Sequence, residues 1–222
     1  MRDQRAELEW REGAVPVSLR FDDPYFSLDN GLAETRHVFL DGNDLPVRFC
    51  DGFHVAELGF GTGLNFLTTW AAWRVAGVPG RFHFTSFEAY PMERGDMAVA
   101  LAAFPELAEL AEALVVGLDD DGCAAFDDAT LRVIAGDARE ALPAWDGQAD
   151  AWYLDGFSPA KNPEMWGEAL MAEVARHTAP DGTAATYTAA GFVRRGLEAA
   201  GFAVTRAPGF GRKRHMTRAA LR

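Results

Sequence analysis

The chain has 222 residues, 49 % of them hydrophobic and 24 % charged, a balance that suits one folded α/β domain and argues against a disordered protein. Its two cysteines lie far apart and form no CxxC pair, so neither a zinc site nor a disulfide framework is indicated. The charged N-terminus and the lack of a long apolar run argue against a signal peptide and a membrane span, so we expect a cytoplasmic protein without a membrane partner.

The charge is unevenly distributed along the chain. The formal net charge of −12 argues against a protein that binds nucleic acid over its whole surface. From residue 186 onward, however, eight Lys or Arg stand against a single acid. Such a basic end can bind phosphate locally, although a solvated basic tail without a ligand is the alternative. Five aspartates between residues 117 and 128 lack the glutamate of a calcium loop, so we expect a solvated surface loop and no metal.

Residues 1–53 do not follow the alternation of strand and helix that comes after them. We expect them to form an N-terminal extension packed on the main domain, residues 54–222. The aromatic and polar segment 21–27, centred on a proline, predicts a loop, and segment 31–40 has apolar residues at helical spacing. Such an extension can cross a sheet edge or the mouth of a site. Its candidate ligand contacts, which turn structure explains equally well, are Tyr25, Ser27, Glu34 and Asn43.

Residues 55–67, VAELGFGTGLNFL, predict a strand, a tight turn and the start of a helix. Gly59, Gly61 and Gly63 occupy alternate positions, which lets the backbone turn sharply and keeps side chains off one rim of the turn. A ligand can therefore lie against the main chain, near the free N–H groups that open the helix. A plain turn without a ligand is the alternative.

The residues around this turn favour a nucleoside cofactor other than NAD or FAD. The dinucleotide fingerprint needs a glycine where the chain has Leu64. Glu57, two positions before the first glycine, places a carboxylate at a strand end, which suits a ligand with a cationic amine. The methionine part of S-adenosylmethionine carries such an amine, so we predict an S-adenosylmethionine site.

Two further acids follow predicted strands. Glu88 ends the alternating segment 81–88, where nucleoside-binding α/β folds place an acid that accepts hydrogen bonds from two ribose hydroxyls. Asp137 follows the predicted strand 130–135 and is an acceptor for an adenine amine. The alternatives are a solvated carboxylate for Glu88 and a helix N-cap for Asp137.

The predicted strand 149–155 ends in Asp155 and runs into a loop at residues 156–166. Ligands of open α/β sheets bind beyond the carboxyl ends of strands, so Asp155 is a candidate site residue. A strand-end acid followed by an aromatic residue and a proline is similar to the Asp-Pro-Pro-Tyr loop of amine methyltransferases, which holds the target nitrogen and stacks on its ring. Lys161 and Asn162 add polar groups to the loop.

The remaining chain predicts a helix to about residue 178, a strand at 183–188, a helix at 190–200 and a closing antiparallel pair at 202–206 and 216–221. Arg194 lies on the second of these helices. The loop at 209–214 mixes glycines with three cations, which makes it a plausible phosphate contact.

Six segments carry a family resemblance: residues 23–27, 38–43, 57–67, 154–166, 187–197 and 209–214. On these segments the chain resembles the methyltransferase domain of the bacterial MnmC family, which completes the 5-methylaminomethyl-2-thiouridine modification at the tRNA wobble position. The run DGFSPAKNPEMW at residues 155–166 is specific to that family, whereas the glycine turn alone would fit any class I methyltransferase.

The resemblance implies a fold and a reaction. The expected fold is an α/β class I (Rossmann-like) methyltransferase with a mostly parallel seven-stranded sheet and helices on both faces. The expected reaction transfers a methyl group from S-adenosylmethionine to the primary amine of 5-aminomethyluridine in the anticodon region of tRNA, with Asp155 as the catalytic residue. The expected cofactor contacts are Glu57, Gly59, Gly61, Gly63, Asn65, Glu88, Asp137, Tyr25 and Ser27. The expected substrate contacts are Phe157, Lys161, Asn162, Trp166, Arg194, Arg212, Lys213 and Arg214.

The chain departs from the family at two places. Bifunctional members carry a C-terminal FAD-dependent oxidoreductase, which this sequence does not contain, so we expect it to act alone on a preformed aminomethyl substrate or beside a separate FAD enzyme. His215 stands where the family usually has glutamate. The alternative functions are a small-molecule amine methyltransferase and a noncatalytic RNA-binding protein on the same fold.

Overall fold

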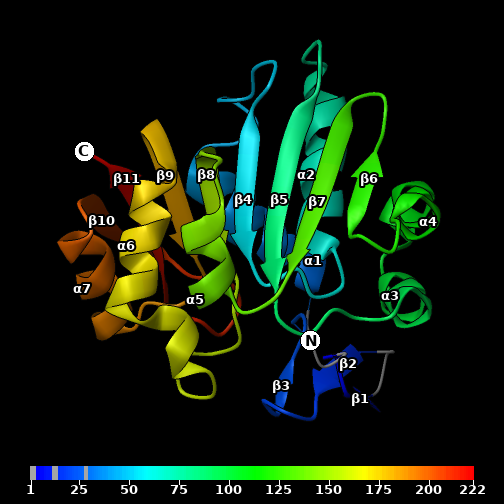
Figure 1. Ribbon diagram of the computed structural model, residues 1–222, viewed down its shortest axis with the longest axis horizontal. Coiled ribbons are helices and arrows are strands. Elements are labelled where there is room, and N and C mark those ends of the chain that lie inside the picture. The colour runs from blue at the N-terminus through cyan, green and yellow to red at the C-terminus, as the bar shows by residue number, and fades with distance from the viewer. Residues whose placement is uncertain (1–3, 12–14, 28–29) are drawn as a thin grey trace.

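The computed structural model describes residues 4–11, 15–27 and 30–222. The strands of its main sheet are β4 (His54–Leu58), β5 (Phe82–Glu88), β6 (Cys123–Ala125), β7 (Ala129–Ala135), β8 (Ala149–Leu154), β9 (Thr178–Thr186), β10 (Phe202–Pro208) and β11 (His215–Leu221). Their order across the sheet is β10-β11-β9-β8-β4-β5-β7-β6 (Figure 1).

The centre of this sheet is parallel. β4 pairs in parallel with β5 and β8, β5 with β7 and β8 with β9, whereas β11, β10 and β6 run antiparallel to their neighbours. The chain builds outward from β4 to β7 and then crosses back to β8 on the other side of β4. A crevice forms where the direction of building reverses, at the carboxyl ends of β4 and β8.

The sheet has one strand more than the seven predicted. β6 pairs with β7, with Ala124 opposite Leu131, inside the segment that the sequence predicts as a solvated acidic loop. Its three residues carry no alternating pattern. The short strand forms because the edge of β7 offers unpaired backbone groups, which is a long-range effect.

Helices cover both faces of the sheet, with α5, α6 and α7 in front of it in Figure 1 and α2 behind. They are α1 (Gly31–Thr35), α2 (Leu64–Ala76), α3 (Arg94–Leu101), α4 (Ala108–Gly117), α5 (Ala138–Ala141), α6 (Glu168–Arg176) and α7 (Gly191–Ala199), with short 3₁₀ or π segments η1 (Arg36–Leu40), η2 (Asp41–Asn43), η3 (Pro105–Leu107), η4 (Leu142–Ala144) and η5 (Pro163–Trp166). Within the described ranges no helix has the length and apolar character needed to cross a membrane.

Each face of the sheet has its own hydrophobic cluster. Phe66 and Trp70 of α2 belong to one cluster, and Leu170 of α6 and Val193 of α7 belong to the other. Because α2 is covered by α1 and α4 as well as by the sheet, it is apolar around most of its circumference. Burial of these side chains fixes the glycine turn that precedes α2 against the sheet.

The N-terminal segment forms a separate antiparallel sheet of β1 (Leu8–Arg11), β2 (Val15–Ser18) and β3 (Asp23–Pro24). It lies beyond the carboxyl ends of the parallel strands (Figure 1). The predicted loop 21–27 therefore contains a short strand, because Val17 and Ser18 of β2 pair with it.

Residues 31–53 are built into the core. Leu32 and Phe53 belong to the same hydrophobic cluster as the central strands. Asn43, a candidate ligand contact from the sequence, is instead fully buried: its amide donates to the Phe39 carbonyl oxygen at 2.9 Å and accepts from Thr183 Oγ1 at 2.6 Å. It joins this segment to β9 and is a structural residue. The domain boundary after residue 53 stays a prediction.

One predicted element boundary differs in the structure. β9 begins at Thr178, earlier than predicted, because Thr178 pairs with Ala149 before an irregularity shifts the register. The closing antiparallel pair at the C-terminal end is confirmed as β10 and β11.

Candidate functional site

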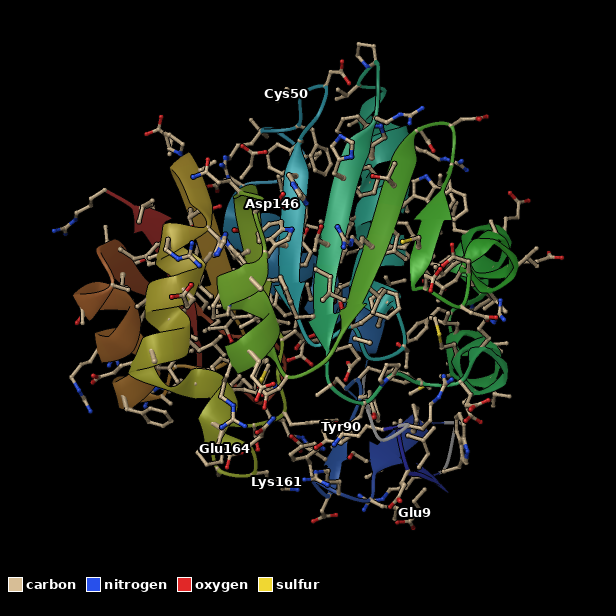
Figure 2. All side chains as sticks on the ribbon, in the orientation of Figure 1. Glu9, Cys50, Tyr90, Asp146, Lys161 and Glu164 are labelled. Carbon is tan, nitrogen blue, oxygen red and sulfur yellow. The ribbon has the colours of Figure 1, made fainter. Side chains whose placement is uncertain are left out.

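The carboxyl ends of β4, β5 and β8 open into a cavity of about 490 Å³ beneath the N-terminal segment and the β10–β11 loop. That volume lies in the range of ligand cavities. Figure 2 shows Tyr90, which lines the cavity, and Lys161 at this end of the molecule, with Cys50 at the opposite end. The sequence-predicted site residues that line it are Tyr25, Ser27, Glu34, Gly59, Gly61, Asn65, Glu88, Asp155, Phe157, Asn162, Arg212 and Lys213.

The glycine turn brings the end of β4 against the end of β8. Gly59 has a φ of +93°, which residues with side chains rarely adopt. A Cβ at Gly59 would lie 2.6 Å from the carbonyl oxygen of Asp155, so glycine is needed for the two strand ends to approach. Gly61, at φ +54°, donates its backbone N–H to Glu88 at 3.0 Å. The turn thereby lies against the backbone of Asp155 on one side and holds the Glu88 carboxylate on the other.

Asn65 joins two carboxyl groups at the floor of the cavity. Its amide nitrogen donates to Glu57 Oε1 and to Asp155 Oδ2, both at 2.7 Å. Ser86 donates to the other oxygen of Glu57 at 2.7 Å. Glu57, predicted as a direct cofactor contact, is fully buried behind the cavity wall and reaches the cavity only through Asn65. Glu57 therefore orients Asn65, and Asn65 orients Asp155.

Burial shifts the protonation of both carboxyl groups. Burial raises the pKa of Asp155 to about 7, against the opposing effects of the Asn65 hydrogen bond and the Lys213 charge. Burial, and then the charge of Asp155, raise the pKa of Glu57 well above its ordinary value. A carboxyl group with a pKa near 7 can accept and release a proton at neutral pH, which suits it to general base chemistry.

Glu88 forms the opposite wall. Its side chain accepts backbone N–H bonds from Gly61 at 3.0 Å and from Tyr90 at 2.8 Å. Burial raises its pKa, whereas these backbone hydrogen bonds lower it. Each carboxylate oxygen has a second lone pair, so Glu88 can still accept hydrogen bonds from two hydroxyls of a ligand in the cavity.

Aromatic rings of the N-terminal segment pack on the loop after β8. Phe21 stacks on Phe157 with ring centroids 4.8 Å apart, and Tyr25 meets Phe157 edge-on at 5.1 Å. Asp23 holds the same loop by accepting the Ser158 N–H at 2.8 Å. The extension therefore closes the mouth of the cavity, as the sequence allowed, and lines it with flat apolar surfaces that can contact a base.

Eight predicted site residues do not line the cavity: Asn43, Glu57, Gly63, Asp137, Lys161, Trp166, Arg194 and Arg214. Asp137 caps α5 by accepting the Arg139 N–H at 2.9 Å, which is the alternative that the sequence left open. Trp166 is 2 % exposed, and its indole N–H donates at 2.9 Å to the backbone of the loop after β8. Lys161 donates to the carbonyl oxygen of Asp22. These three residues support the walls of the cavity.

Sequence reasoning missed several cavity residues, among them Phe21, Tyr90 and Tyr187. Tyr90 comes two residues after β5, and Tyr187 directly follows β9. The strand-end rule that singled out Asp155 would have found both tyrosines. Phe21 reaches the cavity only through the folding of the N-terminal sheet, for which no local pattern exists.

Residues 109–222, which include β8, Asp155 and the loop after it, match a family of proteins described as S-adenosyl-L-methionine-dependent methyltransferases. The chain belongs to this family. It is an S-adenosylmethionine-dependent methyltransferase, as the sequence predicted, and the class I fold is confirmed.

Relatives of this methyltransferase match nearly its whole length. It is 52 % identical to the tRNA 5-methylaminomethyl-2-thiouridine biosynthesis bifunctional protein MnmC of Aeromonas hydrophila subsp. hydrophila over 95 % of this chain and 34 % of the relative. It is 48 % identical to the protein of that name in Stutzerimonas stutzeri over 98 % of this chain and 35 % of the relative. The chain thus spans about a third of these relatives, and its predicted resemblance to MnmC proteins is confirmed.

A solved structure supports the fold independently. The crystal structure of MNMC2 from Aquifex aeolicus matches with a TM-score of 0.79, covering 100 % of this chain and 72 % of that chain at 24 % identity. At that identity the likeness shows the fold alone.

The cavity of this methyltransferase fits S-adenosylmethionine. Glu88 offers acceptors for ribose hydroxyls, and the first turn of α2 lacks a side-chain cap, which leaves backbone N–H groups for a carboxylate. Gly61 keeps the turn open, since a Cβ there would lie 3.1 Å from the Tyr25 ring. When bound, the cofactor supplies an electrophilic methyl group on a sulfonium.

Replacing Glu88 by glutamine is expected to weaken S-adenosylmethionine binding about tenfold, because one acceptor becomes an N–H₂ donor facing the backbone N–H groups of Gly61 and Tyr90. Isothermal titration calorimetry measures the dissociation constant. Glu106→Gln, the same change at an exposed position, is the matched control and should bind like wild type. Equal affinities for both variants would remove Glu88 from the cofactor site.

Proposed function

We propose that this methyltransferase transfers a methyl group from S-adenosylmethionine to the primary amine of 5-aminomethyl-(2-thio)uridine at the tRNA wobble position, giving 5-methylaminomethyl-(2-thio)uridine. The names of relatives at about 50 % identity, which specify tRNA 5-methylaminomethyl-2-thiouridine biosynthesis, support this substrate. The observation that carries the proposal is a carboxyl group in the cavity, Asp155, which Asn65 holds at 2.7 Å and whose pKa is about 7.

An amine can attack a methyl group only through its neutral form, because the reaction needs the nitrogen lone pair. In the proposed mechanism Asp155 accepts a proton from the substrate ammonium through one carboxylate oxygen, while Asn65 fixes the other. The nitrogen lone pair then forms the N–C bond as the C–S bond of the donor breaks and its electron pair stays on sulfur. Positioning of the neutral amine in line with the methyl group provides much of the rate enhancement.

RNA contacts are proposed for the cavity mouth. Phe157 lines the cavity and is the proposed stacking surface for the uracil, with Trp166 supporting it from behind. The cationic loop between β10 and β11 contributes Arg212, Lys213 and Arg214 to phosphates of the anticodon region. Asn162 and Lys161 are further proposed contacts of the modified base, and Arg194 extends the basic surface.

The substrate amine must be exposed by an earlier reaction. We propose that a FAD-dependent oxidoreductase, which removes a carboxymethyl group, is the partner that supplies it, and that both act in the cytoplasm. The proposed reaction requires no metal ion and no membrane partner.

Mass spectrometry of wobble nucleosides tests the function. Transfer RNA that carries the 5-aminomethyl group is incubated with S-adenosylmethionine and the protein, and the nucleosides are then analysed. The expected product gains one methyl group at the wobble uridine. Methylation of free amines with no change in the tRNA would instead support the small-molecule alternative.

The salt dependence of tRNA binding also distinguishes a tRNA methyltransferase from a small-molecule methyltransferase. We expect the logarithm of the tRNA association constant to fall linearly with the logarithm of salt concentration, with a slope of about −3 for some four phosphate contacts. Replacing Arg214 by methionine should reduce the magnitude of this slope by about one. Fluorescence anisotropy between about 50 and 300 mM salt measures it. A slope near zero would contradict RNA binding by the cationic loop.

A further inference from the structure

Lys213 reaches from the β10–β11 loop into the cavity. Its Nζ lies 2.7 Å from Glu34 Oε1 and 4.1 Å from the centre of the Tyr187 ring. The Glu34 side chain is 13 % exposed, and that of Lys213 is 46 % exposed. The ammonium group thus has a largely buried counter-ion, while part of its side chain stays in contact with solvent.

The two groups around this ammonium form a recognition site for an alkylammonium ion. A carboxylate beside the face of an aromatic ring is the arrangement that proteins use to bind such cations. The Tyr187 hydroxyl donates to the carbonyl oxygen of Gly156 at 2.8 Å, which fixes the ring beside the residue that follows Asp155. Glu34 and Tyr187, here called the ammonium seat, line the same cavity as Asp155.

The ammonium seat and Asp155 also influence each other electrostatically. Burial, and then the charge of Asp155, raise the pKa of Tyr187. The Lys213 charge lowers the pKa of Asp155, and the Glu34 charge raises it. A cation in the seat is therefore close enough to the proposed proton acceptor to affect its charge.

We propose that Lys213 is a displaceable occupant of the ammonium seat, and that the aminomethyl ammonium of the RNA substrate takes its place. The inference rests on the proposed function and names the site where the reacting nitrogen first binds. The displaced Lys213 pairs with an RNA phosphate near the neighbouring cations of its loop. A ligand's apparent affinity for the seat equals its intrinsic affinity multiplied by the fraction of time that Lys213 leaves the seat empty. Free amines without phosphate bear this cost in full, whereas an amine on RNA recovers part of it when the displaced Lys213 pairs with a phosphate.

Lys213→Met separates the two roles of the lysine when it is assayed with two substrates. With the nucleoside 5-aminomethyluridine, which has no phosphate, KM should fall about tenfold, because the competing ammonium is gone. With tRNA that carries the same base, KM should rise. The slope of the logarithm of the tRNA association constant against the logarithm of salt concentration should decrease in magnitude by about one. Arg206→Met removes an exposed cation from β10 and should leave the KM for either substrate and the salt slope unchanged. A Lys213→Met enzyme whose KM rises for both substrates would overturn the proposal.

Methylammonium tests the seat without turnover. In Lys213→Met, millimolar methylammonium should shift the NMR signals of the Tyr187 ring, and in Lys213→Met/Glu34→Gln the shift should disappear. Binding in the single variant without tRNA methylation by the wild type would reject the proposed function and leave the seat intact. Methylation of tRNA without methylammonium binding, and with no KM change for the nucleoside, would reject the seat and leave the function intact.

Discussion

Replacing Asp155 by asparagine is expected to lower kcat for tRNA methylation about a thousandfold and to leave the dissociation constant of S-adenosylmethionine within about twofold of wild type. Asparagine has the size of aspartate and can still accept the Asn65 hydrogen bond that spans 2.7 Å. It cannot take a proton from the substrate ammonium. Single-turnover kinetics and calorimetry measure the two quantities separately.

The pH profile gives this prediction a second readout. Because the base form of Asp155 is the active one and its pKa is about 7, kcat/KM of the wild type should rise as pH increases through about 7. The rise should be missing in Asp155→Asn. Asp150→Asn is the matched control, since Asp150 lies on the same strand but does not line the cavity, and its carboxylate accepts the backbone N–H of His54 at 2.8 Å. Full activity of Asp155→Asn, or persistence of the inflection, would remove Asp155 from the reaction.

Replacing Gly59 by alanine is expected to lower the free energy of unfolding by about 3 kcal/mol. The backbone there has a φ of +93°, and the new Cβ would lie 2.6 Å from the Asp155 carbonyl oxygen, so either the turn or the end of β8 must move. That movement would also displace Asp155, so activity should fall together with stability. Urea denaturation followed by circular dichroism measures the loss.

The matched control, Gly95→Ala, is expected to change the free energy of unfolding in the opposite direction. Gly95 lies in α3, and nothing lies within 4 Å of the Cβ that alanine would add. Gly95→Ala should therefore raise stability by about 1 kcal/mol, since alanine favours a helix. Similar effects of the two substitutions would show that the contact between the glycine turn and β8 does not constrain Gly59.

Local patterns were sufficient for the central part of the fold. The alternate glycines predicted the turn between β4 and α2, and strand-end acids pointed to Glu88 and Asp155, which both line the cavity. These features depend on residues close together in sequence and on the rule that parallel strands end at one edge. The same reasoning reached Glu57 but assigned it a ligand contact, because sequence cannot show that Asn65 stands between Glu57 and the cavity.

The features that sequence reasoning missed depend on distant contacts. β6 exists because β7 offers it an edge, and Asn43 is buried because Phe39 and Thr183 satisfy its amide. Trp166 has an aromatic ring that could stack on a base, yet packing around α6 buries it behind the loop after β8. Each outcome depends on which surfaces the tertiary fold brings together, and spacing along the chain does not contain that information.

The contacts that close the cavity join segments that lie far apart in the sequence. Glu34 and Lys213 are separated by 179 positions, and Asp22 and Lys161 by 139. During synthesis on a ribosome, Glu34 and Lys213 cannot meet until the loop between β10 and β11 has left the exit tunnel. A growing chain that has not reached this point therefore lacks the closed mouth of the methyl-donor site, and a tag that holds Glu34 away from the β10–β11 loop should leave a folded but inactive protein.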